Sequence, residues 1–526
     1  MRPLRYLYNC RFAISPALLS ISFILSIYLH NMSELFLSVL FLPLGVVVIF
    51  SVILSWVFII PMKDKDKRSL FLSLFILLIY SYGEVIYLLN HFDLKILAKD
   101  HFIFPLWLLL IVSVFFRIKK TEKNLTAMNK FVLLFSVLSV FIPLFGIAKF
   151  EITERLMQPP VKSSLDLSKI DKPVSKENLP DIYYIVPDSY ASPEVLKKFF
   201  NYHDESFIKY LEQKGFYVPQ NNTSNYPKTF LSLSSTLNME YLDYLSDKKD
   251  SADMSVVIPL INDSNVRKIL NKADYKYYQM GSWWQFTNNN PLADVNYTLE
   301  GKTLGSVGLF NYSILQSTIL SPFIDKLIPK KYVGDSDAEG RDRDIYQFNQ
   351  LPEISKLSGP KFVFAHILTP HIPYVFGKNC EWVTKADTDK KTEEENYVNQ
   401  INCVNLQLKN TIEKLIETSK NPPVIIIQSD EGVPFLRDRL PSTDSWKDAS
   451  DDIVRKKFPI FAAYYLPGIS TSTLSVSTSN VNIFRQVFDA YFKIDLPVLP
   501  DKNYIFKDMN NLYDFIDVTD KLKKIE

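Results

Sequence analysis

The sequence predicts two domains of different fold class. The first is a bundle of five membrane-spanning α-helices, and the second is an α/β domain with a mostly parallel sheet between helices. Three observations support this prediction. Five long apolar runs fill residues 1–149 of the 526-residue chain. A stretch rich in Pro, Ser and Lys follows at 150–180, without apolar periodicity, and is expected to be a linker. Over 181–526, shorter apolar runs alternate with segments of helical spacing.

The five apolar runs are each near the roughly 20 residues that a helix needs to cross a bilayer. They lie at 12–29, 35–61, 69–90, 102–116 and 130–148, and the fourth is the shortest. These runs make the membrane the expected partner of the first domain. The net charge of +2 at pH 7 is close to neutral, so it gives no basis for nucleic-acid binding.

Lysine and arginine are concentrated at alternate ends of these runs. Arg2, Arg5 and Arg11 precede the first run, "MKDKDKR" follows the second, and "RIKKTEKN" follows the fourth. The loops "HNMSE" and "HFDLKILAKDH" are poorer in these residues. By the positive-inside rule, the amino terminus is cytoplasmic and the chain beyond about residue 149 is outside. We therefore expect a multi-pass membrane protein with an extracytoplasmic α/β domain.

One acidic residue, Glu84, lies inside the third apolar run. A carboxylate in the hydrocarbon region of a bilayer is costly and is often functional. The alternative is a carboxylate that reaches the outer interface, and the sequence leaves both explanations open.

Four apolar segments of the second domain predict buried strands. They are "DIYYIVPD" (181–188), "KFVFAHI" (361–367), "PVIIIQSD" (423–430) and "PIFAAYYLP" (459–467). Segments of helical spacing separate them, and the longest is "EEENYVNQINCVNLQLKNTIEKLIETS" ahead of the third strand. This alternation indicates a largely parallel sheet flanked by helices.

Polar residues follow three of these strands. Asp188 ends the first strand, His366 and His371 close the second, and Asp430 and Glu431 end the third. Each has an ordinary alternative as a helix cap, a turn or a packed loop residue. Because parallel strands end at one edge of a sheet, where α/β proteins bind ligands, we expect these side chains to converge. Converging carboxylates form a cage for a hard divalent cation.

These features resemble the alkaline phosphatase/sulfatase superfamily, and within it the membrane-anchored sulfatase-like branch of lipoteichoic acid synthases and phosphoethanolamine transferases. Proteins of that branch also pair five membrane spans with an exterior α/β domain, so the resemblance covers essentially the whole chain. It implies that Asp188, at the end of "YYIVPD", is the first metal ligand. It also implies a bacterial-type plasma (inner) membrane as the location.

The resemblance implies a nucleophile that opens a helix about forty residues after Asp188, and Thr229 matches it in "NYPKTFLSLSSTLNMEYL". A helix N-terminus offers backbone N–H groups and a positive dipole, which suit a phosphate. A threonine that only caps the helix is the alternative. Less favoured nucleophiles on the same helix are Ser232, Ser234 and Ser235.

The family's next landmark is a strand that ends in Asp-His-Gly, and this chain has "SDEG" at 429–432. Asp430 matches the family's metal ligand, and Glu431 replaces the histidine. The resemblance then implies one metal ion held by Asp188, Thr229, Asp430 and Glu431. A set made almost wholly of oxygen favours Mn²⁺ or Mg²⁺, with Ca²⁺ as an alternative and Zn²⁺ disfavoured.

Substrate contacts are implied at several further positions. His371 lies in "HIPY", which resembles a substrate-binding segment of lipoteichoic acid synthases, and His366 is expected to assist it as an acid. Trp283 and Trp284 lie where those synthases hold a phosphoglycerol head, although the arginine expected after them is absent. Arg437, just after the metal segment, is a candidate phosphate ligand, or else a surface arginine.

The activity implied is the metal-dependent transfer of a phosphoglycerol- or phosphoethanolamine-type group through a covalent phospho-threonine. The implied partners are a lipid-linked phosphodiester donor and an envelope polysaccharide or lipid acceptor. A phosphodiester or sulfate-ester hydrolase is the alternative, although the sulfatase signature, Cys or Ser followed by x-Pro-x-Arg, is absent. The replacement by Glu431 also leaves open a non-catalytic membrane protein of the same fold.

Two cysteines, Cys380 and Cys403, fall in the exterior domain. If that space is oxidising they are able to pair, and the sequence favours neither the paired nor the free state. Cys10 lies on the cytoplasmic side and is expected to stay free.

The predicted topology places the carboxyl terminus outside the cytoplasm. A reporter that is active only outside the cytoplasm, fused after Glu526, should therefore be active. A silent reporter on a well-expressed fusion would mean that one span has been miscounted, with 102–116 the first to suspect.

Overall fold

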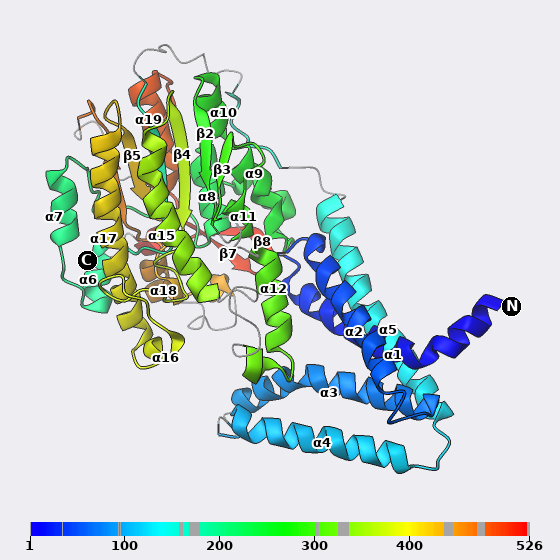
Figure 1. The fold of residues 1–526 in the computed structure, drawn as a ribbon. Coiled ribbons are helices and arrows are strands. Elements are labelled where there is room, and N and C mark those ends of the chain that lie inside the picture. Colours follow the sequence, from blue (N-terminus) through cyan, green and yellow to red (C-terminus); the bar gives the residue numbers. More distant parts are fainter. Residues whose placement is uncertain are drawn as a thin grey trace. The chain divides into compact units, whose positions relative to one another are not determined.

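The structure is a computed structural model of the chain (Figure 1). It describes residues 2–33, 35–92, 94, 96–156, 161–167, 179–282, 284–299, 305–324, 336–435, 445–470 and 479–522. The chain forms two compact units, one built from residues 1–158 with 304–335 and the other from 159–303 with 336–526.

The first unit contains five helices that are long and apolar enough to cross a membrane. They are α1 (Arg2–Asn31), α2 (Phe41–Val57), α3 (Lys65–His91), α4 (Asp100–Lys120) and α5 (Thr126–Phe150). The five-span prediction is confirmed, including its shortest member. Asp64 is the N-cap of α3, because its carboxylate accepts hydrogen bonds from the backbone N–H groups of Asp66 and Lys67.

A later segment of the chain, 305–324, also belongs to the membrane unit. Its helix α12 (Gly305–Gln316) packs Phe310 and Ile314 into the core between α1 and α2. The N–H of Gly83 donates to the carbonyl of Ser317 at 3.2 Å, and a Cβ at Gly83 would lie 2.8 Å from Ser317 Cα. Only glycine allows this approach. The domain boundaries expected at 149 and 181 stay a prediction. The sequence did not predict that the segment 305–324 belongs with the membrane helices.

The described part of the expected linker, 161–167, packs with the α/β unit. Val161, Leu165 and Leu167 lie against its apolar core. The hydroxyl of Ser164 donates to Glu240 Oε2 at 2.6 Å. This segment therefore wraps the domain that follows it.

The α/β unit is built on a six-stranded sheet with the order β3-β2-β4-β1-β5-β6. All neighbouring pairs are parallel except β5 with β6. The strands are β1 (Ile182–Pro187), β2 (Lys276–Met280), β3 (Val295–Tyr297), β4 (Lys361–Ile367), β5 (Val424–Gln428) and β6 (Ala462–Tyr465). The predicted mostly parallel sheet is confirmed, and β2 and β3 were not predicted.

Helices cover both faces of this sheet (Figure 1). On one face lie α15 (Ser336–Ser355) and α17 (Glu393–Thr418), and on the other α8 (Thr229–Asn238), α10 (Asn265–Lys272) and α19 (Ile483–Phe492). Shorter helices are α6 (Pro193–Phe200), α7 (Ser206–Gln213), α9 (Ile258–Asn262), α11 (Gln285–Asn288), α16 (Lys385–Thr388), α18 (Asp451–Lys457) and α20 (Thr519–Leu522). A separate hairpin pairs β7 (Tyr504–Asp508) with β8 (Asn511–Asp517).

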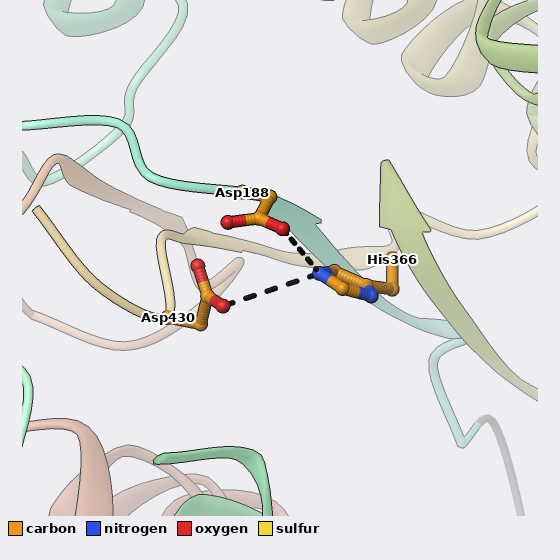
Figure 2. A group of neighbouring side chains, drawn as sticks. All are labelled: Asp188, His366 and Asp430. Carbon is orange, nitrogen blue, oxygen red and sulfur yellow. Dashed lines mark ion pairs between the residues drawn. The ribbon is translucent and has the colours of Figure 1, made fainter. Parts of the chain in front are cut away.

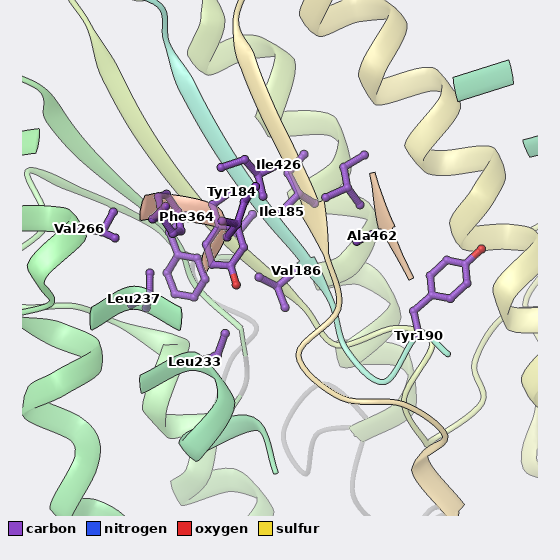
Figure 3. Close-up of a cluster of buried hydrophobic side chains, with 14 of the residues drawn as sticks. Tyr184, Ile185, Val186, Tyr190, Leu233, Leu237, Val266, Phe364, Ile426 and Ala462 are labelled. Atoms are coloured by element: carbon purple, nitrogen blue, oxygen red, sulfur yellow. The ribbon is translucent and has the colours of Figure 1, made fainter. Parts of the chain in front are cut away.

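The three central strands are buried along their whole length. Tyr184 of β1 stacks on Phe364 of β4 with ring centroids 5.6 Å apart, and Leu233 and Leu237 of α8 belong to the same cluster (Figure 3). Burial on both faces explains why "VIIIQ" is continuously apolar instead of alternating. This packing holds the ends of β4, β1 and β5 in fixed register.

Cys380 and Cys403 form a disulfide with a Cα–Cα distance of 4.8 Å. It joins the loop that follows β4 to α17. The two cysteines are therefore paired, which the sequence alone did not decide.

Replacing both cysteines with serine should lower the free energy of unfolding by about 3 kcal/mol, because the bond restricts the unfolded chain over its 23-residue separation. Urea unfolding of the full-length protein measures the change. Reductant should weaken the wild type by the same amount and leave the double variant unchanged. Peptide mapping that finds both thiols free would contradict the assignment.

Candidate metal and active site

Three side chains from neighbouring strands meet at the carboxyl edge of the sheet (Figure 2). Asp188 follows β1, His366 is the sixth residue of β4, and Asp430 follows β5. His366 Nε2 lies 3.5 Å from Asp188 Oδ2 and 4.0 Å from Asp430 Oδ2. The expected convergence of strand ends is therefore present in the fold.

The atoms that face one another in this group lack hydrogen-bond partners. His366 Nε2, Asp430 Oδ2 and Glu431 Oε2 are buried, and none has such a partner in the described part of the chain. Buried polar atoms in native proteins are nearly always satisfied, and three such atoms at one place suit a bound cation. One ligand atom each from Asp188, His366 and Asp430 lie within 4.8 Å of one another, as do those of Asp188, His371 and Glu431. These donors fit a divalent metal ion.

The ring of His366 is held in place from behind. Its Nδ1 lies 2.9 Å from the hydroxyl of Thr287 in α11, so Nε2 is directed toward the carboxylates. Such a partner on the second ring nitrogen is usual for histidines that bind metals. The sequence analysis gave His366 a substrate role and expected an almost purely oxygen site. The structure instead places an imidazole nitrogen among the carboxylates.

The pKa values of the group reflect its crowding. Burial raises the pKa of Asp188, but the His371 and His366 rings outweigh burial and hold that pKa below its usual value. Burial raises the pKa of Asp430, and the negative charges of Asp188 and Glu431 raise it further. Burial lowers the pKa of His366, yet the pull of Asp188 raises it overall. The site as a whole therefore favours an added positive charge.

Part of that positive charge comes from Lys457, at the end of α18. Its ammonium donates to Glu431 Oε1 at 2.7 Å, and both side chains are almost fully buried. The sequence analysis missed this residue, because Lys457 lies in the unremarkable charged helix "DDIVRKK" and in no recognised motif. One oxygen of Glu431 is thus paired with lysine, and the other, Oε2, remains for a metal.

The backbone turn after β1 connects the three carboxylates. Ser189 has φ of 61°, a left-handed conformation that costs a non-glycine residue about 1 kcal/mol or more. In this position its hydroxyl lies 2.9 Å from Asp188 Oδ1 and 3.1 Å from Glu431 Oε1. Its N–H donates to Asp430 Oδ1 at 3.1 Å. Ser189 is a second site residue that the sequence analysis did not identify.

Gly432 allows the turn after β5 that aims Asp430 and Glu431 at the same place. A Cβ at Gly432 would lie 2.6 Å from the carbonyl oxygens of Lys456 and Lys457. The glycine of "SDEG" is therefore required by close backbone packing against the end of α18.

Thr229 is the first residue of α8, as predicted, and its hydroxyl is close enough to Asp430 to lower the pKa of that carboxyl. The N–H groups of Leu231 and Ser232 already bond to the carbonyl of Lys228. The alternative hydroxyls of Ser234 and Ser235 are buried and donate to backbone carbonyls. Of the predicted nucleophiles, Thr229 is the one whose hydroxyl contacts Asp430.

Two predicted substrate residues lie beside this site. The ring of Trp284 meets His366 edge-on at 6.0 Å between centroids and stacks on Phe286. His371 is half-buried and offers a nitrogen near Asp188 and Glu431. Trp283 and Arg437 lie outside the described residues.

No protein-family model matches the chain, and no curated protein matches it. Among solved structures, the lipooligosaccharide phosphoethanolamine transferase A of Neisseria meningitidis, an integral membrane protein, matches with a TM-score of 0.42 at 13% identity, over 91% of this chain and 95% of that one. The periplasmic domain of the Campylobacter jejuni phosphoethanolamine transferase EptC matches with a TM-score of 0.39 at 13% identity, over 64% of this chain and 94% of that one. The zinc complex of the Escherichia coli EptC periplasmic domain has a TM-score of 0.41 at 13% identity, over 66% and 95%.

These solved structures include the phosphoethanolamine transferases to which the sequence motifs point.

The buried pair of Lys457 and Glu431 generates a prediction about stability. Lys457→Met should lower the unfolding free energy of the metal-free protein by about 3–5 kcal/mol, because it leaves a buried carboxylate unpaired. Divalent metal should then restore more stability to this variant than it adds to the wild type. Thermal unfolding with chelator, Mn²⁺ or Zn²⁺ measures both effects.

Lys456→Met is the matched control. Lys456 bonds to Asp452, which is 59% exposed, so its loss should change stability by less than about 1 kcal/mol. Equal destabilisation by the two substitutions would contradict a special role for Lys457.

Proposed function

We propose that this chain is a member of the sulfatase-like branch of the alkaline phosphatase/sulfatase superfamily and transfers a phosphoglycerol- or phosphoethanolamine-type group. The donor is a lipid-linked phosphodiester, and the acceptor is an envelope glycan or lipid. The observation that carries the proposal is the meeting of Asp188, His366 and Asp430 beside Thr229 at the start of a helix. A metal cage next to a hydroxyl at a helix N-terminus is suited to a phosphoryl group.

The metal proposed is a divalent ion held by Asp188, His366, Asp430 and the free oxygen of Glu431. When bound, it would neutralise charge on the phosphoryl oxygens and favour the alkoxide form of a nearby hydroxyl. Because the donors include His366 Nε2, Mg²⁺ fits less well than the sequence suggested. Mn²⁺ and Zn²⁺ are the ions to compare.

Thr229 is the proposed nucleophile. Its Oγ forms a bond to phosphorus while the ester bond from phosphorus to the lipid alcohol breaks. The hydroxyl proton is released to water as this bond forms, because Asp430 is itself a proposed ligand of the ion. In the second step an acceptor hydroxyl attacks phosphorus and Thr229 leaves as the free alcohol.

Other residues of the site position the reacting groups. At the N-terminus of α8, the N–H groups of Thr229 and Phe230 are the ones proposed to meet phosphoryl oxygens, because those of Leu231 and Ser232 bond to Lys228. His371, at the open side of the group, is placed to protonate the departing lipid alcohol. Trp284 supplies a flat apolar wall next to His366 for the transferred group. Water in place of the acceptor would give hydrolysis by the same route.

Loss of the nucleophile tests this proposal. Full-length Thr229→Ala, given a fluorescent lipid phosphodiester and metal, should lose roughly 10⁴-fold or more in turnover. Intact-mass analysis of the wild type should show a phospho-adduct at Thr229 that chelator prevents. Thr229→Ser should retain measurable turnover, because it keeps a hydroxyl.

Ser232→Ala, on the same helix, is the matched control and should form the adduct as the wild type does. An adduct that persists in Thr229→Ala would contradict the assignment of the nucleophile. Product that forms equally with and without a glycan or lipid acceptor would favour hydrolysis over transfer.

A further inference from the structure

One glutamine of α17 holds the loop that carries His371, residues 370–376. Gln400 is fully buried, and its Oε1 accepts hydrogen bonds from the N–H groups of Val375 and Phe376 at 2.8 and 3.2 Å. Its Nε2 donates to the carbonyl of His371 at 2.8 Å and to a second loop carbonyl at 3.2 Å. An amide has two acceptor positions and two donors, so the whole capacity of this side chain is used on one loop.

The sequence of the loop explains why a side chain is needed there. Pro370 and Pro373 have no backbone N–H, which removes two of the donors that the loop would otherwise have. Carbonyls that are buried require a partner, and those of Pro370 and His371 find it in Gln400. The glutamine thus takes the place of the regular secondary structure that the loop lacks.

A disulfide attaches the same part of the chain to the same helix. Cys403, three residues after Gln400 in α17, is bonded to Cys380, just beyond the loop. Val375 and Phe376 pack with Cys403 in a small buried cluster. Residues three apart in a helix lie on one face, so the loop and the chain after it are held on one face of α17 at two points.

The backbone of this loop orients the ring of His371. Its Nδ1 lies 2.6 Å from the carbonyl of Ile372, and a carbonyl only accepts, so Nδ1 carries a hydrogen. Nε2 is then the nitrogen available to the site, where the ring lies near Asp188 and Glu431. A shift of the loop would move this nitrogen, and a displacement of about 1 Å at a reacting group can cost about 10²-fold in rate.

We propose that Gln400 is a positioning residue that keeps Nε2 of His371 aimed at the leaving group. This inference rests on the proposed function, in which the Nε2 proton of His371 passes to the lipid alcohol oxygen as the bond from phosphorus to that oxygen breaks. Gln400 acts only through the loop. Its loss should therefore slow those substrates whose leaving group must be protonated.

Two phosphodiesters that differ only in the leaving group test the proposal. Both carry a phosphoethanolamine group, on 4-nitrophenol in one and on dodecanol in the other, and each is given with metal to the full-length protein. A nitrophenolate leaves without a proton, whereas a dodecyl alkoxide requires one. Gln400→Met should lower kcat on the dodecyl ester about 100-fold and on the nitrophenyl ester less than about 3-fold.

Two further variants separate positioning from general damage to the site. Gln407→Met makes the same substitution two turns later in α17, where the amide donates to Cys380 Sγ at 3.6 Å, and it should leave both rates unchanged. In a His371→Ala background, Gln400→Met should add less than about 3-fold to the loss on the dodecyl ester, because both act through one group. Equal losses on the two esters, or full additivity with His371→Ala, would overturn the proposal.

Hydrogen exchange tests the contact without any turnover. Gln400→Met removes the acceptor for Val375 and Phe376, so the peptide that contains these amides should exchange about ten-fold faster. Gln400→Asn keeps the amide on a shorter side chain and should show smaller changes of both kinds. Unchanged exchange in Gln400→Met would overturn the inference whatever the esters show. A wild type that turns over neither ester would contradict the proposed function, and faster exchange in the variant would still support the attachment of the loop by Gln400.

Discussion

Three carboxylates that are buried close together are the constraint on which the α/β unit depends. Asp188, Asp430 and Glu431 are brought together because β1 and β5 are adjacent parallel strands, and the turns after them face the same way. Mutual repulsion in such surroundings is not screened by water, so each carboxylate requires a positive or hydrogen-bonding partner. Lys457, Ser189 and the His366 ring meet part of that requirement. The unsatisfied atoms that remain define the place for a metal ion.

Several features around the site position these three carboxylates. In its left-handed conformation, the N–H of Ser189 reaches Asp430 and its hydroxyl reaches Asp188 and Glu431. Gly432 is needed because the turn after β5 presses against the carbonyls of α18. Lys457 is buried at the end of that helix, where its charge complements Glu431. The strained Ser189, the close approach at Gly432 and the buried charge of Lys457 all lie around the same carboxylates.

The membrane unit shows a related principle in an apolar setting. Glu84 is exposed and lines a groove among α1, α3 and α5, where water can reach its carboxylate. A segment from far along the sequence, 305–324, belongs to the same unit and lines one side of this groove. Gly83, one residue before Glu84, permits that packing. A charged group and the backbone contact that shapes its surroundings are thus neighbours in sequence.

The sequence by itself determined the class of each unit and much of the site. Apolar runs of bilayer length specify five spans, and continuous β-branched runs specify buried parallel strands, because both depend on local composition. Asp188, Asp430 and His366 were found because strand ends in a parallel sheet share an edge.

Tertiary structure alone decided the pairing of Lys457 with Glu431, the place of His366 among the carboxylates, and the insertion of 305–324 into the membrane unit. Each joins residues distant in sequence through packing that leaves no local periodicity or motif. The disulfide between Cys380 and Cys403 belongs to the same class, because pairing depends on the approach of a loop to α17. Local chemistry thus indicated which polar residues lie at the edge of the sheet, and long-range packing set the charge around them.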